Sequence, residues 1–286
     1  MARMDPANIR RIAITAIFSD ELLLELLVLK GGNALDLVHG LAARASYDLD
    51  FSIEGDFSDV DDIARRLFRA LRDRFDAVGM LVFDERFEPQ PKSRRPGLDD
   101  RWGGYKAEFK LMPVTSAAAL GHDLGAMRRQ STVLSSSNGR VFKIEISKCE
   151  HVDGKVELEL DAFPVVAYST EMIVAEKLRA ICQQMPGYEM NTHRHGRARD
   201  FYDIYGAVNR GKLDLSSSQN LRLIRAMFAA KDVPLQFLPR IRDYREFHRT
   251  DWPSVLQMVA EPAMDFDVYF DFVVELVSKL EVLWNE

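Results

Sequence analysis

The sequence has few cysteines and no long apolar run, and these absences narrow the class of protein. Cys149 and Cys182 are the only cysteines in 286 residues, too few and too far apart for a disulfide framework or a zinc site, so we expect two buried thiols. His193 and His195 have no further metal ligand nearby in the sequence. No apolar run is long enough to cross a bilayer, and the N-terminal segment MARMDPANIRR is too polar for a signal peptide. We therefore expect a cytoplasmic protein that does not bind a membrane.

The sequence also has no excess of basic over acidic residues. The net charge is −6, which argues against an extended basic surface for nucleic acid. Local basic groups remain near residues 65–74, 92–95 and 194–199, and one of them could guide an RNA end. In the first group, apolar residues recur at helical spacing between the arginines, which favours a solvated helix face over an RNA-binding ridge.

Several common catalytic motifs are absent as well. Gly31 and Gly32 form a glycine pair, but no Gly-Lys-Ser/Thr follows it, which excludes a Walker-type loop, and no third glycine completes a Rossmann fingerprint. The chain also lacks a Gly-x-Ser-x-Gly elbow and a nucleophilic cysteine arrangement, so acyl transfer has no support.

The most informative stretch that is present is LKGGNALDLVHGLAARASYDLDFS, residues 29–52. Gly31 and Gly32 follow an apolar run and precede a helix-like segment, where their backbone amides can meet phosphate oxygens. Asp48 and Asp50 alternate with apolar residues, and on a strand this spacing directs both carboxylates to one face. Paired carboxylates suit Mg²⁺, which proteins commonly share with the phosphates of a nucleotide. The pattern predicts a nucleotide site with Asp48 and Asp50 as metal ligands.

Two blocks of residues give the chain a resemblance to a known family. The first block comprises Lys30, Gly31, Gly32, Ala34, Leu35, Arg44, Ser46, Asp48, Leu49, Asp50 and Phe51. The second is AEKLRAI at residues 175–181, followed by RARDFYDIY at residues 197–205. With these blocks the chain resembles the AbiEii/AbiGii-type nucleotidyltransferase toxins and, more distantly, the polymerase-beta nucleotidyltransferase superfamily. The resemblance extends over residues 20–210.

The resemblance implies particular site residues. In the family, the first block carries the glycine turn and the metal carboxylates, and the second supplies a lysine and an aspartate that line the same cleft. The implied catalytic residues are Asp48, Asp50, Lys177 and Asp200. Many relatives have Thr or Ser where this chain has Asn33, and a hydrogen bond from Asn33 to phosphate remains possible. The expected nucleotide-binding residues are Gly31, Gly32, Asn33, Arg44, Ser46 and Lys177.

Two metals commonly need a third acid. Glu145 in VFKIEIS is our candidate, because its apolar neighbours lie on the opposite face of a strand. An exposed strand face explains the same pattern equally well. Glu108 in YKAEFKL has the same alternation and is the reserve candidate. The expected metal set is therefore Asp48, Asp50 and Glu145.

The second block has open alternatives of its own. Lys177 lies opposite the apolar stripe of a helix, which would leave its ammonium free to reach a triphosphate. Asp200, together with Arg199, could orient the metal site, the incoming nucleotide or Lys177. Asp203 shares the helix face of Asp200, or it caps or pairs structurally.

Arg44 and Ser46 stand just before the acidic strand. They could contact phosphate or brace the glycine turn. Arg44 could equally form a structural ion pair with Asp50 or Asp36.

Periodicity predicts where the elements lie. We expect helices at residues 7–25, 33–40, 60–75 and 116–130, and strands ending at residue 30 and over residues 47–53, 80–87, 105–112, 140–147 and 155–160. Residues 88–104, rich in proline, glycine and charge, predict a surface loop or flap. Helices are expected near residues 170–184, 197–210, 217–230, 252–260 and 265–283.

The change of pattern near residue 165 predicts two domains. We expect an α+β fold, with a polymerase-beta-like mixed sheet flanked by helices in a nucleotidyltransferase domain over residues 1–164. A helical C-terminal domain over residues 165–286 would complete a catalytic cleft between the domains.

Three functions are compatible with these observations. The first is a Mg²⁺-dependent nucleotidyltransferase toxin of a toxin-antitoxin system, which transfers NMP from an NTP to an RNA acceptor, in the family the tRNA 3′ end, and is neutralised by a separately encoded antitoxin protein. The second is a nucleotidyltransferase that modifies a small molecule or protein, and the acidic net charge suits a small-molecule acceptor. The third is a non-catalytic nucleotide-binding module, against which the clustered Asp48, Asp50 and Lys177 count.

Overall fold

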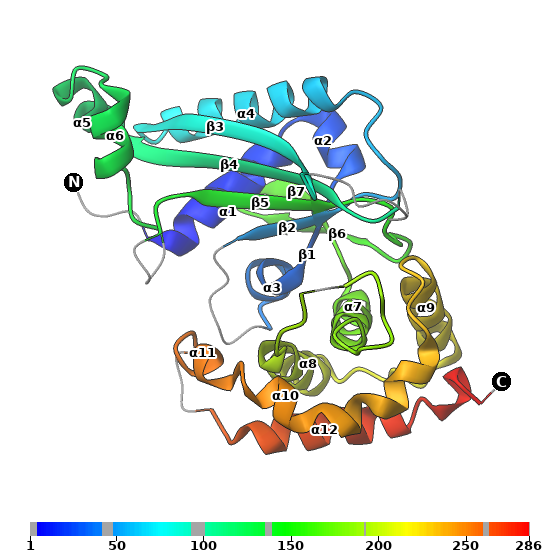
Figure 1. Ribbon diagram of the computed structural model, residues 1–286. Coiled ribbons are helices and arrows are strands. Elements are labelled where there is room, and N and C mark those ends of the chain that lie inside the picture. Colours follow the sequence, from blue (N-terminus) through cyan, green and yellow to red (C-terminus); the bar gives the residue numbers. More distant parts are fainter. Residues whose placement is uncertain are drawn as a thin grey trace. The chain divides into compact units, whose positions relative to one another are not determined.

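The computed structural model describes residues 5–41, 48–92, 101–134, 139–191, 193–259 and 263–285 (Figure 1). The chain forms two compact units. The first consists of Met1–Asn33, Ser46–Cys149 and Val156–Ala167, and the second of Ala34–Ala45, Glu150–Lys155 and Tyr168–Glu286. The second unit thus takes two short segments from earlier in the chain in addition to the C-terminal region.

The first unit is built on a seven-stranded mixed sheet in the order β3-β4-β5-β2-β1-β7-β6. The strands are β1 (Val28–Lys30), β2 (Leu49–Ser52), β3 (Met80–Gln90), β4 (Gly104–Pro113), β5 (Phe142–Ser147), β6 (Val156–Leu160) and β7 (Phe163–Ala167). The pairs β1–β7 and β2–β5 are parallel, and the other neighbouring strands are antiparallel. The mixed sheet with its helices confirms the predicted α+β class, and β2, which carries Asp50, is the central strand.

Helices α1 (Pro6–Ile17) and α4 (Val60–Asp76) pack against each other and cover one face of this sheet (Figure 1). The core side of α4 buries Ile63, Leu67, Leu71 and Phe75. On its other side, Arg66 and Arg69 pair with Asp20. The buried apolar face predicted for this helix is confirmed, and its arginines form ion pairs on the other side.

Two helices expected to be continuous are interrupted by capping residues. The helix predicted over residues 7–25 ends at Ile17, and Asp20 then caps α2 (Glu21–Leu26) by accepting hydrogen bonds from the backbone amides of Leu22 and Leu23. Likewise α5 (Val114–Ala119) and α6 (Leu124–Gln130) are separated by a turn that contains Gly121 at φ +59° and the N-cap Asp123.

Strand β7 was not expected from the sequence, because Pro164 indicates a break. Its pairing explains why the proline is tolerated. Pro164 lies opposite Glu159 of β6, whereas on the β1 side only Ala167 is paired, with Leu29. The missing N–H of the proline therefore removes no hydrogen bond from the ladder between β7 and β1.

The predicted loop over residues 88–104 overlaps the sheet at both ends. Strand β3 continues to Gln90 and β4 begins at Gly104, and the two residues are paired. Residues 93–100, which include Arg94 and Arg95, lie outside the described part of the chain.

The second unit is helical, as predicted for the C-terminal region. It contains α7 (Thr170–Cys182), α8 (Ala198–Gly211), α9 (Ser218–Ala229), α10 (Arg245–Arg249), α11 (Trp252–Leu256) and α12 (Phe266–Ser278), together with the π-helical turn η1 (Ala34–Val38) and the 3₁₀ helices η2 (Leu235–Tyr244) and η3 (Glu281–Leu283). Helix α7 is almost wholly buried and packs against α8, α9 and η2. Helices η2 and α10 were not predicted, and Pro239 within η2 obscures the helical pattern there.

Both cysteines are free thiols. Cys182 is buried, and burial raises the pKa of its thiol, whereas Cys149 is half-buried. Among the described helices, none has the length and apolarity that crossing a membrane requires.

Candidate active site

A row of charged side chains crosses the sheet from β1 to β4. Lys30 lies opposite Asp50, Asp50 opposite Glu145, and Glu145 opposite Lys106. Residues that lie directly opposite each other point to the same face of a sheet. Asp48 comes two residues before Asp50, directly before β2. The structure therefore brings Asp50 and Glu145 together on adjacent parallel strands, with Asp48 at the end of one of them.

The glycine turn is in contact with this acidic strand. Gly31 has φ +68°, a backbone conformation that disfavours every residue with a Cβ. A Cβ at this position would also lie 2.8 Å from Oδ2 of Asp50. Gly32, the second residue of α3 (Gly31–Asn33), is buried. The two halves of the sequence motif, the turn and Asp50, are thus adjacent in space.

Asn33 is fully buried and holds Asp48 in place. Its Nδ2 donates a hydrogen bond to the backbone carbonyl of Asp48 at 2.6 Å, and its Oδ1 accepts one from Nη1 of Arg10 at 3.1 Å. The amide therefore braces the acidic strand, which differs from the expected hydrogen bond to phosphate. Arg10 was missed by sequence reasoning. The sequence does contain an indication of its role, because Arg10 lies next to Ile9 and three residues before Ala13, and both of these residues are buried in α1.

Lys30 also supports the acidic row. Its side chain is buried, and its Nζ donates a hydrogen bond to Oγ of Ser147 on β5 at 2.9 Å. Because β2 lies between β1 and β5, this bond spans the strand that carries Asp50. The lysine thereby places a positive charge beside the acidic strand.

Lys106 on β4 separates the two candidates for a third acid. It forms a hydrogen-bonded ion pair with Glu108. This pair raises the pKa of Lys106 above its usual value, although burial lowers it, and the charges of Glu145 and Asp48 raise it further by smaller amounts. Glu108 is therefore already neutralised by a lysine. Glu145 is exposed and lies in register with Asp50, so the structure favours Glu145.

The donor chemistry of this face suits a divalent cation in part. Among the described residues, no three His, Cys, Asp or Glu side chains lie close enough together to form a metal site. Asp48 and Asp50 supply hard oxygen donors, and Mg²⁺ commonly binds one or two carboxylates and takes its other ligands from water and phosphate. Arg44 and Ser46, the expected phosphate contacts that precede Asp48, lie outside the described residues.

In the second unit, the structure brings Lys177 of α7 together with two carboxylates of α8. The Lys177 ammonium lies 3.0 Å from Oδ1 of Asp200 and 2.7 Å from Oδ2 of Asp203, and its side chain is only 4% exposed. The expectation of a free ammonium is therefore wrong for this structure, because α8 covers the lysine. Asp203 takes the structural pairing that had been left open.

Arg197 is the arginine that bonds to Asp200, with its Nε 2.5 Å from Oδ2, while the expected Arg199 is exposed. Burial alone would raise the pKa of Asp200, but the charges of Arg197 and Lys177 outweigh it and hold that pKa well below its usual value. Asp200 therefore remains ionised at neutral pH. Its oxygens are engaged by cations on two sides.

His248 was not indicated by any sequence motif. It is fully buried, its Nδ1 accepts a hydrogen bond from the backbone amide of Arg197 at 3.2 Å, and its ring packs on Phe201. Burial lowers its pKa to about 4. A neutral imidazole thus supports the residue that bonds to Asp200. By contrast, His193 and His195 are exposed.

Comparison with known proteins identifies the family. The sequence matches the family described as "Nucleotidyl transferase AbiEii toxin, Type IV TA system" over residues 12–272. No protein of curated function matches.

Among solved structures, a protein from H. pylori assigned as a nucleotidyltransferase is 17% identical, with 98% of this chain and 97% of that chain covered and a TM-score of 0.49. The nucleotidyltransferase toxin MenT4 from Mycobacterium tuberculosis is 16% identical, with 96% and 82% covered and a TM-score of 0.49. The family match spans most of the chain. This chain therefore belongs to the AbiEii family, the nucleotidyltransferase toxins of type IV toxin-antitoxin systems.

Proposed function

We propose that this toxin transfers a nucleoside monophosphate from an NTP to the 3′ hydroxyl of an RNA, with the tRNA 3′ end as acceptor, in a Mg²⁺-dependent reaction. The observation that carries the proposal is the contact between Gly31 and Asp50, where a Cβ would lie 2.8 Å from the carboxylate. A phosphate bound by the amides of Gly31 and Gly32 would lie beside that carboxylate. This arrangement suits phosphoryl transfer, in which catalysis consists mainly of positioning and charge neutralisation.

Asp48 and Asp50 are the residues that would hold magnesium, with Glu145 on the adjacent strand as the third acid. When bound, the ion neutralises charge on the triphosphate and polarises the phosphate that is attacked. The chain itself holds these carboxylates in place. Asn33 fixes the backbone of Asp48, and Lys30 places a positive charge in register with Asp50.

The remaining assignments concern phosphate binding and the second unit. We assign the triphosphate to the amides of Gly31 and Gly32, with Arg44 and Ser46 as further contacts. We also assign Lys177 and Asp200 to the transfer reaction, because they match the second block of the family motif. The charge-assisted hydrogen bonds that Lys177 donates to Asp200 and Asp203 keep the lysine in one orientation.

The proposed partners follow from the family. The substrates are an NTP and tRNA, which meet the toxin in the cytoplasm, and a separately encoded antitoxin protein neutralises it. We propose no membrane partner.

The experiment that tests this function follows labelled nucleotide into RNA. The purified protein and an Asp48→Ala variant are each incubated with magnesium, total tRNA and one of four α-labelled NTPs. We expect label in tRNA with the intact protein, none with the variant and none when EDTA replaces magnesium. Label that stays out of RNA while the NTP still binds would shift the assignment to a small-molecule or protein acceptor. Absence of nucleotide binding would favour a non-catalytic module.

A further inference from the structure

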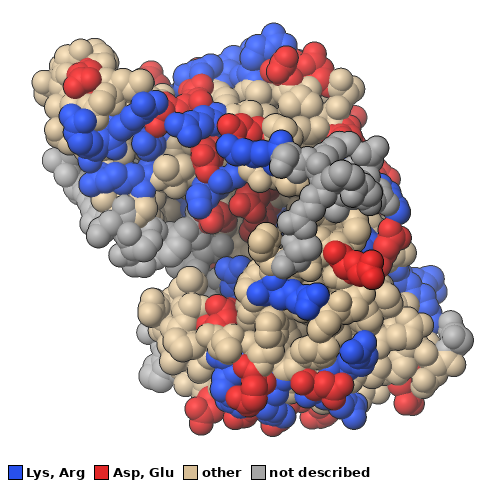
Figure 2. Space-filling view, in the orientation of Figure 1, with Lys and Arg blue, Asp and Glu red and all other residues tan. Residues whose placement is uncertain are grey.

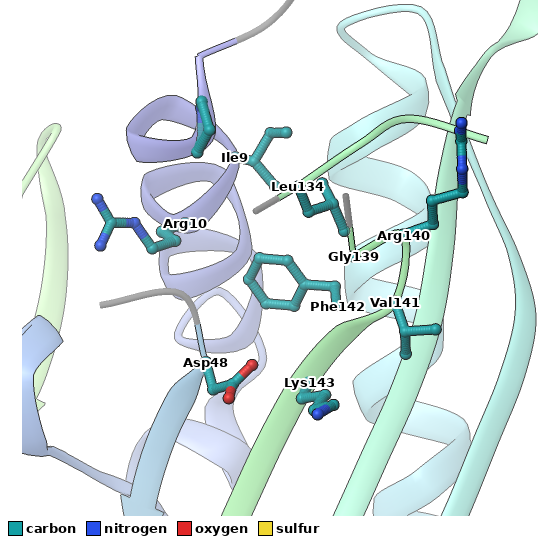
Figure 3. Close-up of a pocket in the computed structure, with 10 residues that line it drawn as sticks. Ile9, Arg10, Asp48, Leu134, Gly139, Arg140, Val141, Phe142 and Lys143 are labelled. Atoms are coloured by element: carbon teal, nitrogen blue, oxygen red, sulfur yellow. The ribbon is translucent and has the colours of Figure 1, made fainter. Parts of the chain in front are cut away.

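A cavity of about 410 Å³ opens in the first unit beside the start of β2 and β5 and the N-terminal end of α1 (Figure 3). Its lining consists of Pro6, Ile9, Arg10, Asp48, Leu134, Gly139, Arg140, Val141, Phe142 and Lys143. The volume is in the range of small-ligand sites. Gly31 and Asp50 are not among the lining residues, so the cavity reaches the acidic strand at Asp48 and not at the glycine turn.

The charged part of the lining is mainly basic. It comprises Arg10, Arg140 and Lys143 against a single acid, Asp48, and the guanidinium groups of Arg10 and Arg140 point away from Asp48 (Figure 3). Asp48 and Lys143 lie side by side at one end of the cavity (Figure 3), as expected from the pairing of the next residues, Leu49 and Ile144. Asp48 also acts electrostatically on Lys106 of β4, and Lys143 lies opposite Glu108 of the same strand.

The two arginines differ in what they can offer. Arg10 directs its guanidinium to Asn33 and contributes mainly its stem to the cavity. Arg140 donates one N–H to the backbone carbonyl of Ser131, at the C-terminal end of α6, and keeps further donors for a ligand. Lys143 and Arg140 are therefore the cations that suit an anionic group in this cavity.

The apolar part of the lining suits the flat, weakly polar body of a base or sugar. Ile9, Leu134 and Phe142 form this side. A ligand that satisfies both parts carries negative charge next to an apolar ring, as a nucleotide does. A bare metal ion or an inorganic anion would leave the apolar side uncovered.

The surroundings extend the basic character. Lys and Arg side chains gather around α5 and α6 (Figure 2), and Arg140 is bonded to the end of α6. Such a surface can follow the phosphates of a strand whose last nucleotide occupies the cavity. The net charge of −6 is thus compatible with a local site for RNA.

We propose that this cavity is the acceptor subsite, which takes the 3′-terminal nucleotide of the RNA. The inference rests on the proposed function and adds where the acceptor binds. Lys143 and Arg140 contact the phosphodiester of the terminal nucleotide, and its 3′ hydroxyl lies next to Asp48. In the transfer, the hydroxyl oxygen bonds to the α-phosphorus of the NTP and the α–β phosphoanhydride bond breaks. Pyrophosphate leaves, and the hydroxyl proton passes to solvent water.

The test separates acceptor binding from nucleotide binding. Steady-state constants are measured for RNA and for NTP with the wild type and with Lys143→Ala, Arg140→Ala and Val141→Trp. The last variant places a ring in the lining of the cavity at Val141, which is 37% exposed, so a larger side chain there does not disturb the core. Arg65→Ala on α4, whose arginine side chain is 71% exposed, is the matched control for loss of a surface cation.

We expect KM for RNA to rise about tenfold in Lys143→Ala and Arg140→Ala, the effect of losing one hydrogen bond to a charged group. KM for RNA should also rise in Val141→Trp, because the ring occupies space in the cavity, and KM for NTP should be unchanged in all three variants. The control should behave as the wild type. Unchanged KM for RNA in both Lys143→Ala and Val141→Trp would overturn the subsite, even though the wild type labels RNA.

A second measurement keeps the subsite testable if the wild type labels no RNA. Binding of a fluorescent RNA trinucleotide with a free 3′ hydroxyl is followed by anisotropy. Weaker binding to Lys143→Ala and Val141→Trp than to Arg65→Ala would support the subsite although the proposed reaction had failed. Equal binding to all variants would refute it.

Discussion

Asn33 donates a hydrogen bond from its side-chain amide to the backbone carbonyl of Asp48, 2.6 Å away and 15 residues further along the chain. The other end of the same amide accepts from Arg10. Three segments of the first unit, α1, the glycine turn and the start of β2, are thereby tied together at the residue that we assign to the metal.

Replacing Asn33 by Ala should therefore damage both stability and transfer. The change leaves the Asp48 carbonyl and the Arg10 guanidinium without this partner in the interior, which costs about 1–3 kcal/mol of unfolding free energy. We expect kcat to fall by about tenfold or more because Asp48 loses its fixed position. Chemical denaturation and labelled-NTP transfer measure the two effects. Asn209→Ala is the control, because Asn209 makes a similar bond on an exposed helix face, and it should leave kcat unchanged.

Gly31→Ala should abolish transfer, whereas Gly40→Ala should not. Both glycines have positive φ, +68° and +63°, so each variant carries similar backbone strain of about 1–2 kcal/mol. Only at Gly31 would the new Cβ meet the Asp50 carboxylate, since nothing lies within 4 Å at Gly40. Thermal unfolding and transfer assays on the pair separate strain from displacement of the carboxylate. Equal loss of activity in both variants would contradict the assignment of Asp50.

The third acid can be identified by comparing Glu145→Gln with Glu108→Gln. Glu145 lies opposite Asp50, whereas Glu108 is paired with Lys106. We expect Glu145→Gln to raise the magnesium concentration needed for half-maximal activity by about tenfold, as loss of one charged ligand would. Glu108→Gln should have a much smaller effect. A magnesium titration of activity decides between them, and the reverse order would assign the role to Glu108.

Lys177→Met should destabilise the second unit strongly. The change leaves Asp200 and Asp203 buried without their shared cation, and breaking such a pair costs about 3–5 kcal/mol. Lys212→Met, at an exposed position at the end of α8, should have almost no effect. Lys177→Arg keeps the charge, so it should recover part of the stability, while transfer stays low because the guanidinium does not reproduce the compact ammonium between Asp200 and Asp203. Transfer at the wild-type rate by a folded Lys177→Arg protein would instead indicate a structural lysine.

Buried His248 should make the protein less stable in mild acid. Its pKa falls from 6.5 to about 4 on folding, so between these values the unfolded chain binds a proton that the folded chain does not. Stability should therefore decrease as pH falls through this window and level off below it, by at most about 3 kcal/mol from this group. Denaturant titrations from pH 7 to pH 4 measure the slope. His248→Gln should remove that part of the slope, because the amide does not titrate.

The elements that could be predicted are those in which local pattern and tertiary environment agree. The alternation of acidic and apolar residues around Asp50 predicted strand β2, and the helical spacing of apolar residues over positions 60–75 predicted α4. Strand β7 was missed because Pro164 is tolerated only through its particular neighbours in the sheet, which no local pattern records.

The same limit applies to the site. Gly31 and Asp50 could be paired from the sequence because the motif is short and ordered. Arg10 acts across 23 residues and His248 across 51, so their roles exist only after folding. Lys177 was predicted in part. The spacing of apolar residues predicted its helix, but it could not predict that the carboxylates of α8 pair with the lysine.

The central position of β2 has a consequence for motion. With β1 and β5 bonded to its two edges, the backbone of Leu49–Ser52 can open only when the sheet itself comes apart, so its amide protons should be among the slowest in the chain to exchange with solvent. The Asp50 carboxylate therefore extends from a backbone segment that stays in place while substrates bind and products leave. Substrates must adapt to this carboxylate, because its strand does not move toward them.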